Sequence, residues 1–181
     1  GDCDRCLAVD EKGNVVDGDK MMYILACRLK SRGMLSNNTV VATIMSNSGF
    51  VNSLKREGIN CELTTVGDRF VYERMQQKDY DLGGEQSGHI ILKKYATTGD
   101  GLLTAIMLTE ELCDRKLTLS KLAEPVFLYP QFTKNVRVTD KDAAMTNENV
   151  LNAIKQTEEK INGRGRVLLR KSGTEPVVRV M

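Results

Sequence analysis

The feature that most constrains the fold is an alternation of strand-like and helix-like segments between residues 20 and 123. The continuous apolar, β-branched run TVVATIM at 39–45 is typical of a strand covered on both faces. A helical pattern precedes it at 19–32, with Asp19 as the expected N-cap and Gly33 as the expected stop. Such alternation predicts an α/β fold, in which a three-layer, mostly parallel sheet carries helices on its faces.

The rest of this region continues the alternation, and a short hairpin precedes it. Residues 6–16 predict two short strands around a turn at Lys12, Gly13 and Asn14. Further along, the patterns predict a helix at 50–58, a strand at 61–66, a helix at 68–78, two strands around a polar turn within 80–92, and a helix at 100–113.

A second, smaller module follows a proline-bounded linker at Pro125 to Pro130. Strand patterns at 132–138, 166–170 and 177–181 surround one helical pattern at 147–162. This order predicts a small α+β domain with an antiparallel sheet.

Composition excludes several classes of function. The formal net charge of +2 is too small to indicate nucleic acid or an anionic membrane surface as a partner. No apolar run approaches the ~20 residues that span a bilayer, and no leader pattern opens the chain. The five cysteines are odd in number and scattered, so we expect no disulfide framework and a reducing, cytoplasmic location.

The sharpest motif is RKSGTEPVVR, in which Arg170 and Arg179 flank a turn of Ser172, Gly173 and Thr174. Guanidinium forks suit phosphate oxygens, and hydroxyl and backbone N–H groups can complete an anion cradle. A solvated basic hairpin is the alternative. The density of arginines, hydroxyls and glycine in one short stretch favours the anion site.

A second motif, GGEQSGH at 83–89, combines glycines with Glu85 and Ser87. Glycines let a backbone approach a ligand closely, while the carboxylate and hydroxyl can bind sugar-type hydroxyl groups. His89 is the single histidine of the chain and a candidate general acid or base. A polar hairpin turn with a packed histidine is equally compatible with the spacing.

The chain opens GDCDRC, where Asp2 and Asp4 alternate as in an oxygen-ligand loop for Mg²⁺. A D-x-D pair alone is also common in surface turns. Cys3 and Cys6 form C-x-x-C, but no second cysteine or histidine pair completes a zinc site.

Two other glycine-containing stretches are TVGDRF at 65–70 and TTGDG at 97–101. Each places an aspartate beside the expected start of a helix, which is typical of a strand-to-helix cap. We predict a structural role for both.

Taken in this order, the stretches closely resemble the α-D-phosphohexomutase superfamily and, within it, the bacterial members that act on glucosamine phosphates. The four-domain family has a metal loop D-G-D-G-D-R, a sugar loop G-E-x-S-G-H and a phosphate loop R-x-S-G-T-E-P-x-x-R. Gln86 and the contexts VGDRF and RVM favour the glucosamine members. The resemblance covers the whole chain and implies the end of domain 2 at 1–19, domain 3 at 20–124, a linker at 125–130, and a C-terminally truncated domain 4 at 131–181.

The resemblance also implies residue roles. Asp2 and Asp4 would bind Mg²⁺, the first aspartate of the metal loop would precede Gly1, and Arg5 would lie beside the transferring phosphoryl group. Cys3 would replace a glycine or alanine of the family's loop, which leaves the metal ligands intact but restricts the loop backbone. The resemblance also implies that the C-x-x-C spacing is accidental and that the alternating aspartates carry the function.

In the other two loops, Glu85 and Ser87 would hold sugar hydroxyls with His89 near the reacting end. The phosphate that does not react would be clamped by Arg170, Ser172, Gly173, Thr174 and Arg179.

The implied reaction is the interconversion of glucosamine 6-phosphate and glucosamine 1-phosphate through a phosphoserine and glucosamine 1,6-bisphosphate, which feeds amino sugar and peptidoglycan precursor synthesis. The serine belongs to domain 1, and Ser46 and Ser48 stand in the wrong context to replace it. We therefore expect a chain that is inactive alone, that requires domains 1 and 2, and whose parent enzyme could be a homodimer.

Three alternatives stay open at this point. A related mutase could act on mannose or glucose phosphates, and a non-catalytic module could bind phosphosugars. A haloacid-dehalogenase-type phosphatase would use Asp2 as nucleophile, but it would need a hydroxyl residue where Arg5 stands.

Overall fold

The computed structural model describes residues 3–162, 165–173 and 175–181. The chain divides into two compact units, Gly1–Leu128 and Tyr129–Met181. Each unit has its own sheet and is described by itself.

The first unit is built on a four-stranded sheet in the order β4-β3-β5-β6. β3 pairs in parallel with both β4 and β5, and only β6 runs antiparallel, as the partner of β5. The strand bounds are Thr39–Thr43 for β3, Asn60–Thr64 for β4, Leu82–Gly84 for β5 and Ile90–Leu92 for β6. Every residue of β3 is buried, as its continuous apolar sequence predicts, and the mostly parallel α/β fold is confirmed.

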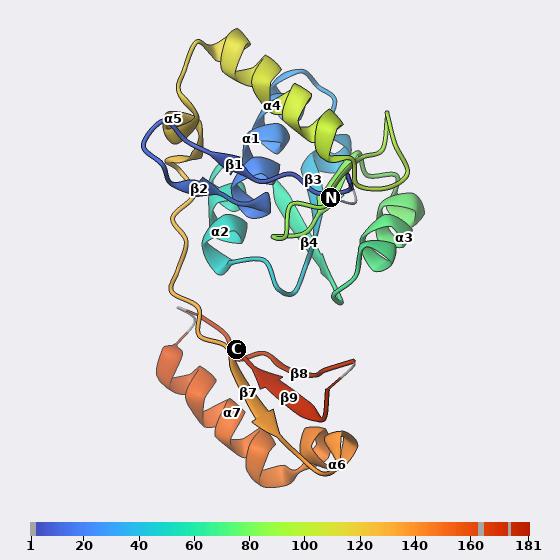
Figure 1. Cartoon of the computed structure of the whole chain (residues 1–181), viewed down its shortest axis with the longest axis vertical. Coiled ribbons are helices and arrows are strands. Elements are labelled where there is room, and N and C mark those ends of the chain that lie inside the picture. Colours follow the sequence, from blue (N-terminus) through green and yellow to red (C-terminus); the bar gives the residue numbers. More distant parts are fainter. Residues whose placement is uncertain (1–2, 163–164, 174) are drawn as a thin grey trace. The chain divides into compact units, whose positions relative to one another are not determined.

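Helices cover both faces of this sheet, so the unit has three layers. On one face, Val41 packs with Val71 and Met75 of α3. On the other, Val40 and Ala42 join the larger core formed with α1 and α2, and Figure 1 shows the strands between these helices. The helices are α1 Gly18–Ser31, α2 Ser48–Arg56, α3 Asp68–Lys78, α4 Gly101–Arg115 and α5 Leu119–Ala123, with a 3-10 turn at Ser36–Asn38.

The start of α1 differs from the prediction. Asp17, not Asp19, is the N-cap, and its carboxylate accepts a hydrogen bond from the Lys20 N–H at 3.1 Å. Asp19 lies inside the helix and is buried, where its carboxylate accepts from the Asn47 N–H at 2.7 Å. The helix begins two residues earlier because Asp17 has the extended backbone of a cap, whereas Asp19 is used for a long-range contact.

A two-stranded hairpin precedes α1. β1 (Ala8–Val9) pairs antiparallel with β2 (Val15–Val16), and the turn between them is the predicted one. β1 is shorter than the predicted strand at 6–9, whereas β2 has the predicted bounds.

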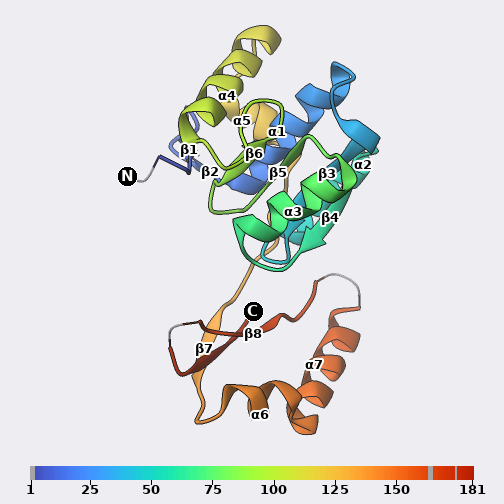
Figure 2. The ribbon, with the colours of Figure 1, turned by 90° about the vertical axis from the view of Figure 1, so that its right-hand side faces the viewer.

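The second unit has a three-stranded antiparallel sheet in the order β7-β9-β8, with two helices (Figure 2). Its elements are β7 Lys134–Arg137, α6 Lys141–Thr146, α7 Glu148–Ile161, β8 Leu169–Lys171 and β9 Val177–Val180. The predicted α+β arrangement is confirmed, whereas α6 was not predicted from the sequence.

Among the described residues, no helix has the length and apolar character that crossing a membrane requires.

Candidate functional site

The opening loop is held between two other loops of the first unit. The Cys6 N–H donates to the Gly88 carbonyl at 3.1 Å, and the Cys3 carbonyl accepts from the Gly101 N–H at 2.9 Å. The loop is therefore fixed against the β5–β6 hairpin on one side and the start of α4 on the other. Asp2 lies outside the described residues.

Close approach at these contacts depends on glycine. A Cβ added to Gly88 would lie 1.9 Å from the Cys6 carbonyl oxygen, and its φ of +91° also favours glycine. A Cβ on Gly101 would lie 2.3 Å from the Arg5 carbonyl oxygen. Any larger residue at either position would push the opening loop away.

Asp4 and His89, which are far apart in the sequence, meet in this loop cluster. His89 Nδ1 lies 3.0 Å from Asp4 Oδ2, and the His89 side chain is buried. The Gly99 N–H donates to His89 Nε2 at 3.0 Å. Two sequence motifs, the opening loop and GGEQSGH, are thus joined by a direct side-chain contact.

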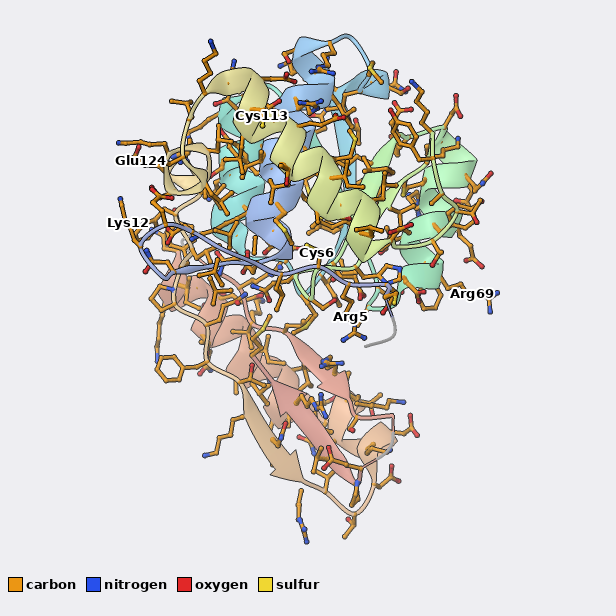
Figure 3. The ribbon with its side chains drawn as sticks, turned by 45° about the horizontal axis from the view of Figure 1, so that its top comes forward. Arg5, Cys6, Lys12, Arg69, Cys113 and Glu124 are labelled. Carbon is orange, nitrogen blue, oxygen red and sulfur yellow. The ribbon has the colours of Figure 1, made fainter. Side chains whose placement is uncertain are left out.

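Arg5 and Cys6 behave differently in the same loop (Figure 3). The Arg5 side chain is 58% exposed, with Nε 3.7 Å from Asp4 Oδ2, so its guanidinium is accessible to an anionic ligand. Cys6 packs against the core, and burial raises the pKa of its thiol. A raised thiol pKa disfavours the thiolate needed for zinc or redox chemistry at a C-x-x-C pair.

The β5–β6 hairpin presents Glu85 and Ser87 at its tip. Ser87 Oγ donates to Glu85 Oε2 at 3.3 Å, and the Gly67 N–H donates to Glu85 Oε1 at 3.1 Å. Ser87 is exposed and Glu85 is half-buried. The carboxylate is therefore oriented by backbone while its hydroxyl neighbour faces solvent.

The two stretches predicted to be ordinary caps both reach this cluster. Asp100 does cap α4, since its carboxylate accepts from the Leu103 N–H at 2.9 Å. Its neighbour Gly99 contacts His89, however, and Asp68 Oδ2 lies 3.8 Å from His89 Nε2. The sequence analysis did not predict that these stretches lie near His89. It used the VGDRF context around Asp68 only to favour the glucosamine members of the superfamily.

The chemistry of this cluster fits a hard cation in part. Asp4 offers a carboxylate, the ligand type that Mg²⁺ prefers. Within residues 3–162, 165–173 and 175–181, however, no group of three or more acidic, histidine or cysteine side chains could hold a metal. A Mg²⁺ site here would need Asp2 and further oxygen donors in addition to Asp4.

The second unit carries the other predicted site, on the connection between β8 and β9. Arg170 and Arg179 are directly paired across these strands, so both side chains lie on one face of the sheet. Ser172 is 4% exposed, and its Oγ accepts from the Glu175 N–H at 3.3 Å. A Cβ added to Gly173 would meet no atom within 4 Å, which leaves the backbone open to a ligand. Thr174 lies outside the described residues.

The arginines are only partly neutralised by the protein. Arg179 Nη2 donates to Glu175 Oε2 at 3.1 Å. Its buried Nε has no hydrogen-bond partner among the described residues. The arrangement leaves hydrogen-bonding capacity for an anion.

Two further cations, which the sequence reasoning missed, belong to this region. Lys141 Nζ donates to the carbonyls of Ser172 at 2.9 Å and Glu175 at 3.3 Å, which ties the turn backbone to α6. Arg137 pairs with Val177, two residues before Arg179 on β9, so the register places Arg137 on the same face as Arg179. A β-strand period of two could have identified Arg137 once the strand pairing was known.

Comparison with known protein families gives two matches. The domain described as "Phosphoglucomutase/phosphomannomutase, alpha/beta/alpha domain III" matches residues 17–129. The domain described as "Phosphoglucomutase/phosphomannomutase, C-terminal domain" matches residues 134–181.

Among curated proteins, the chain is similar to phosphoglucosamine mutases of Bacillus species. It is 54% identical to that of Bacillus cytotoxicus over 181 residues, which is 100% of this chain and 40% of the relative. The values for the Bacillus cereus protein are the same. The chain thus spans 40% of the length of these curated relatives.

Solved structures share the fold. A crystal structure of N-acetylglucosamine-phosphate mutase in its product complex matches with a TM-score of 0.77 at 21% identity, over 99% of this chain and 43% of that one. The Aspergillus fumigatus N-acetylphosphoglucosamine mutase, in complex with GlcNAc-6P and magnesium, matches with a TM-score of 0.76 at 20% identity, over 99% and 46% of the two chains. The chain belongs to the phosphoglucomutase/phosphomannomutase family, and it carries that family's domain III and C-terminal domain.

Proposed function

We propose that the chain is the sugar- and phosphate-binding part of a phosphoglucosamine mutase, which interconverts glucosamine 6-phosphate and glucosamine 1-phosphate. The 54% identity to phosphoglucosamine mutases over the whole chain supports this substrate. The observation that carries the proposal is the meeting of Asp4 and His89 at 3.0 Å, because it joins the candidate metal loop to the candidate sugar loop.

In the first unit, the proposed roles follow from exposure and contacts. The exposed Arg5 guanidinium would stabilise negative charge on the transferring phosphoryl group. Glu85 and Ser87 would bind sugar hydroxyls, with the carboxylate held in orientation by the Gly67 N–H.

Asp2 and Asp4 would hold Mg²⁺, which when bound would offset charge on the phosphoserine and the transferring group. The fold-related Aspergillus fumigatus protein has been crystallised with magnesium, which is in keeping with this assignment.

In the second unit, the paired arginines would clamp the phosphate that does not react. Two guanidinium groups directly opposite each other repel, and a bound phosphate dianion would remove that cost. Lys141 would hold the turn so that its backbone N–H groups remain available. The proposed phosphate-binding residues are Arg137, Arg170, Ser172, Gly173, Thr174 and Arg179.

The nucleophile would come from elsewhere in the protein. No stretch of this chain matches the family's phosphoserine loop, so we expect no turnover by the chain alone. The cycle would need domains 1 and 2, a bisphosphorylated sugar as intermediate, and a cytoplasmic phosphosugar pool.

The test is turnover by the longer protein that contains this chain. We expect kcat/KM for glucosamine 6-phosphate to exceed the values for mannose and glucose 6-phosphates. Glu85→Gln should lower kcat/KM by about tenfold or more, since a hydrogen bond to a charged group is worth about 1.5–3 kcal/mol.

Glu124→Gln is the matched control, because Glu124 is exposed and, in the part of the chain that the structure describes, its one ion pair is with Lys121 at 3.0 Å. A preference for mannose or glucose phosphate would replace the proposal with the related mutase. Absence of turnover on every phosphosugar would favour a non-catalytic binding module.

A further inference from the structure

We propose that Asp17 and Gly18, at the start of α1, are positioning residues that set the geometry of the tip of the β5–β6 hairpin. The tip consists of residues 85–88 and carries Glu85 and Ser87, which we propose bind sugar hydroxyls. The expected effect on turnover rests on the proposed function, whereas the contacts between α1 and the tip do not.

The backbone of Gly18 lies directly against the tip. The Gly18 N–H donates to the Gln86 carbonyl at 3.0 Å. A Cβ added to Gly18 would lie 2.1 Å from the Glu85 carbonyl oxygen. The same Cβ would lie 2.7 Å from the Gly88 nitrogen and 2.9 Å from the Gln86 carbonyl carbon. Because all three are backbone atoms, the tip itself would have to move to admit a side chain.

The Asp17 carboxylate links the helix start to the same tip. Its Oδ1 accepts from the Lys20 N–H at 3.1 Å, which caps α1, and its Oδ2 accepts from Gln86 Nε2 at 3.4 Å. Gln86 therefore contacts α1 with both its carbonyl and its side-chain amide. Its two neighbours contact each other instead, since Ser87 Oγ donates to Glu85 Oε2 at 3.3 Å. Gln86 thus anchors the tip, which leaves the side chains on either side of it for a ligand.

Two other contacts hold the tip away from Gln86. The Cys6 N–H donates to the Gly88 carbonyl at 3.1 Å, and the Gly67 N–H donates to Glu85 Oε1 at 3.1 Å. The first contact fixes the end of the tip and the second fixes one carboxylate. The support at Gln86 itself comes from α1.

The helix is a rigid base for these contacts. Met21, Met22 and Leu25 are fully buried in the core of the first unit. Asp19 is buried as well, and its carboxylate accepts from the Asn47 N–H at 2.7 Å. Since a close-packed core resists an added atom, a side chain at residue 18 would displace the tip rather than the helix.

Gly18→Ala separates this contact from helix propensity. Alanine is favoured over glycine within a helix, so propensity alone predicts no loss from the substitution. The proposed contact predicts a local loss at the tip, because the new Cβ would break the hydrogen bond between the residue 18 N–H and the Gln86 carbonyl.

Amide hydrogen exchange in the chain measures that loss without turnover. We expect Gly18→Ala to speed exchange at residues 18 and 88 by tenfold or more and to leave the amides of β3 unchanged. Lys20→Ala is the matched control, because Lys20 lies in the same turn of α1 and contacts Asp17 through its backbone N–H, which alanine keeps. Unchanged exchange at residues 18 and 88 in a folded Gly18→Ala chain would overturn the proposal.

A second variant covers the case in which alanine at residue 18 unfolds the chain. Asp17→Ser keeps an N-cap, but the single oxygen of serine cannot take the places of both Oδ1 and Oδ2. We expect the side-chain amide signals of Gln86 and the backbone amides of 86–88 to shift in this variant, with the helix content retained by circular dichroism. An absence of shifts at these signals would contradict the role of Asp17.

In the longer protein, a double-mutant cycle distinguishes positioning of the tip from a general loss of structure. Misplacing a binding group by about 1 Å can cost about 10²-fold in rate, so we expect Gly18→Ala to lower kcat/KM by about tenfold or more. If the substitution acts through the Glu85 carboxylate, it should cost about threefold or less in a Glu85→Gln background. Lys20→Ala should leave kcat/KM within about twofold in both backgrounds.

Equal losses from Gly18→Ala in the two backgrounds would refute the positioning role and leave the proposed function intact. Absence of turnover on every phosphosugar would instead refute the proposed function. The exchange measurement would then still decide whether α1 sets the geometry of the tip.

Discussion

At the scale of single residues, Cys3 occupies a backbone conformation that suits glycine. Its φ is +66°, in the left-handed region. The resemblance to the glycine-containing metal loop implied that a cysteine here would restrict the backbone, and the dihedral angle gives that restriction a cause. A non-glycine residue with a left-handed backbone destabilises the folded state by roughly 1–3 kcal/mol. Glycine removes this strain, but part of the gain is lost because glycine increases the conformational entropy of the unfolded chain.

We therefore expect Cys3→Gly to raise the free energy of unfolding by about 0.5–1 kcal/mol, measured by urea denaturation. Cys3→Ala is the control, because alanine removes the thiol but keeps the Cβ that makes this φ unfavourable. An equal gain from alanine would show that the thiol, not the backbone, is the source of the strain.

At the scale of elements, a buried arginine joins α1 to α4. Arg28 is 2% exposed and contacts Glu110 at 2.7 Å, Glu111 at 2.8 Å and Asp114 at 2.8 Å. Of the three carboxylates, only that of Glu111 is buried, at 8% exposed. Removing the arginine would leave this acid without its main counter-charge.

We expect Arg28→Ala to lower the free energy of unfolding by about 3 kcal/mol or more, which is the typical cost of removing one partner of a buried ion pair. Arg32→Ala is the matched control. Arg32 shares Asp114 at 2.6 Å but is 46% exposed, so its removal should cost less than about 1 kcal/mol. Similar losses in the two variants, followed by circular dichroism in urea, would contradict the assigned role of burial.

The sheet of the second unit gives a prediction for phosphate binding. Arg137 lies on the same face as Arg170 and Arg179, whereas Lys134, three residues earlier on β7, lies on the opposite face. We expect Arg137→Ala to weaken binding of inorganic phosphate by about three- to tenfold, since a charge-assisted hydrogen bond of partly exposed groups is worth on the order of 1 kcal/mol.

Lys134→Ala removes the same charge from the same strand and should change the affinity by less than twofold. Titration of both variants by NMR distinguishes a local contact from a general effect of net charge. Equal weakening would remove Arg137 from the site.

Local patterns predicted most of these elements, but they missed two short helices and one long-range contact. The apolar run at 39–45 and the helical pattern at 68–78 carried enough periodicity to identify β3 and α3. The five-residue α5 and six-residue α6 are too short to show a helical period. The contact between Gly99 and His89 could not be predicted from local patterns, because the two residues lie ten positions apart across a turn.

At the scale of the whole molecule, the two compact units coincide closely with the two family domains, which match 17–129 and 134–181. The units differ in how much they bury. The first has a large core around Met21, Met22 and Leu25, whereas no residue of α6 or α7 is buried in the second. The sequence order of motifs could assign each site to its unit, but it could not reveal that Asp4, His89 and Gly99 form one connected group.

The proposed phosphate site uses residues of the second unit only. It needs no metal and no residue from the first unit, so it should bind inorganic phosphate in the chain as it stands. Affinity should be on the order of millimolar, because inorganic phosphate lacks the sugar that we propose Glu85 and Ser87 of the other unit bind.

Phosphate binding at the turn between β8 and β9 is tested most directly by titrating the ¹⁵N-labelled chain with inorganic phosphate and following its amide chemical shifts. We expect shifts that cluster at residues 170–179, and a loss of affinity in Arg170→Lys, since lysine cannot form the bidentate fork. Shifts confined to the loop around Asp4, or an Arg170→Lys variant that binds phosphate as well as the unmodified chain, would contradict it.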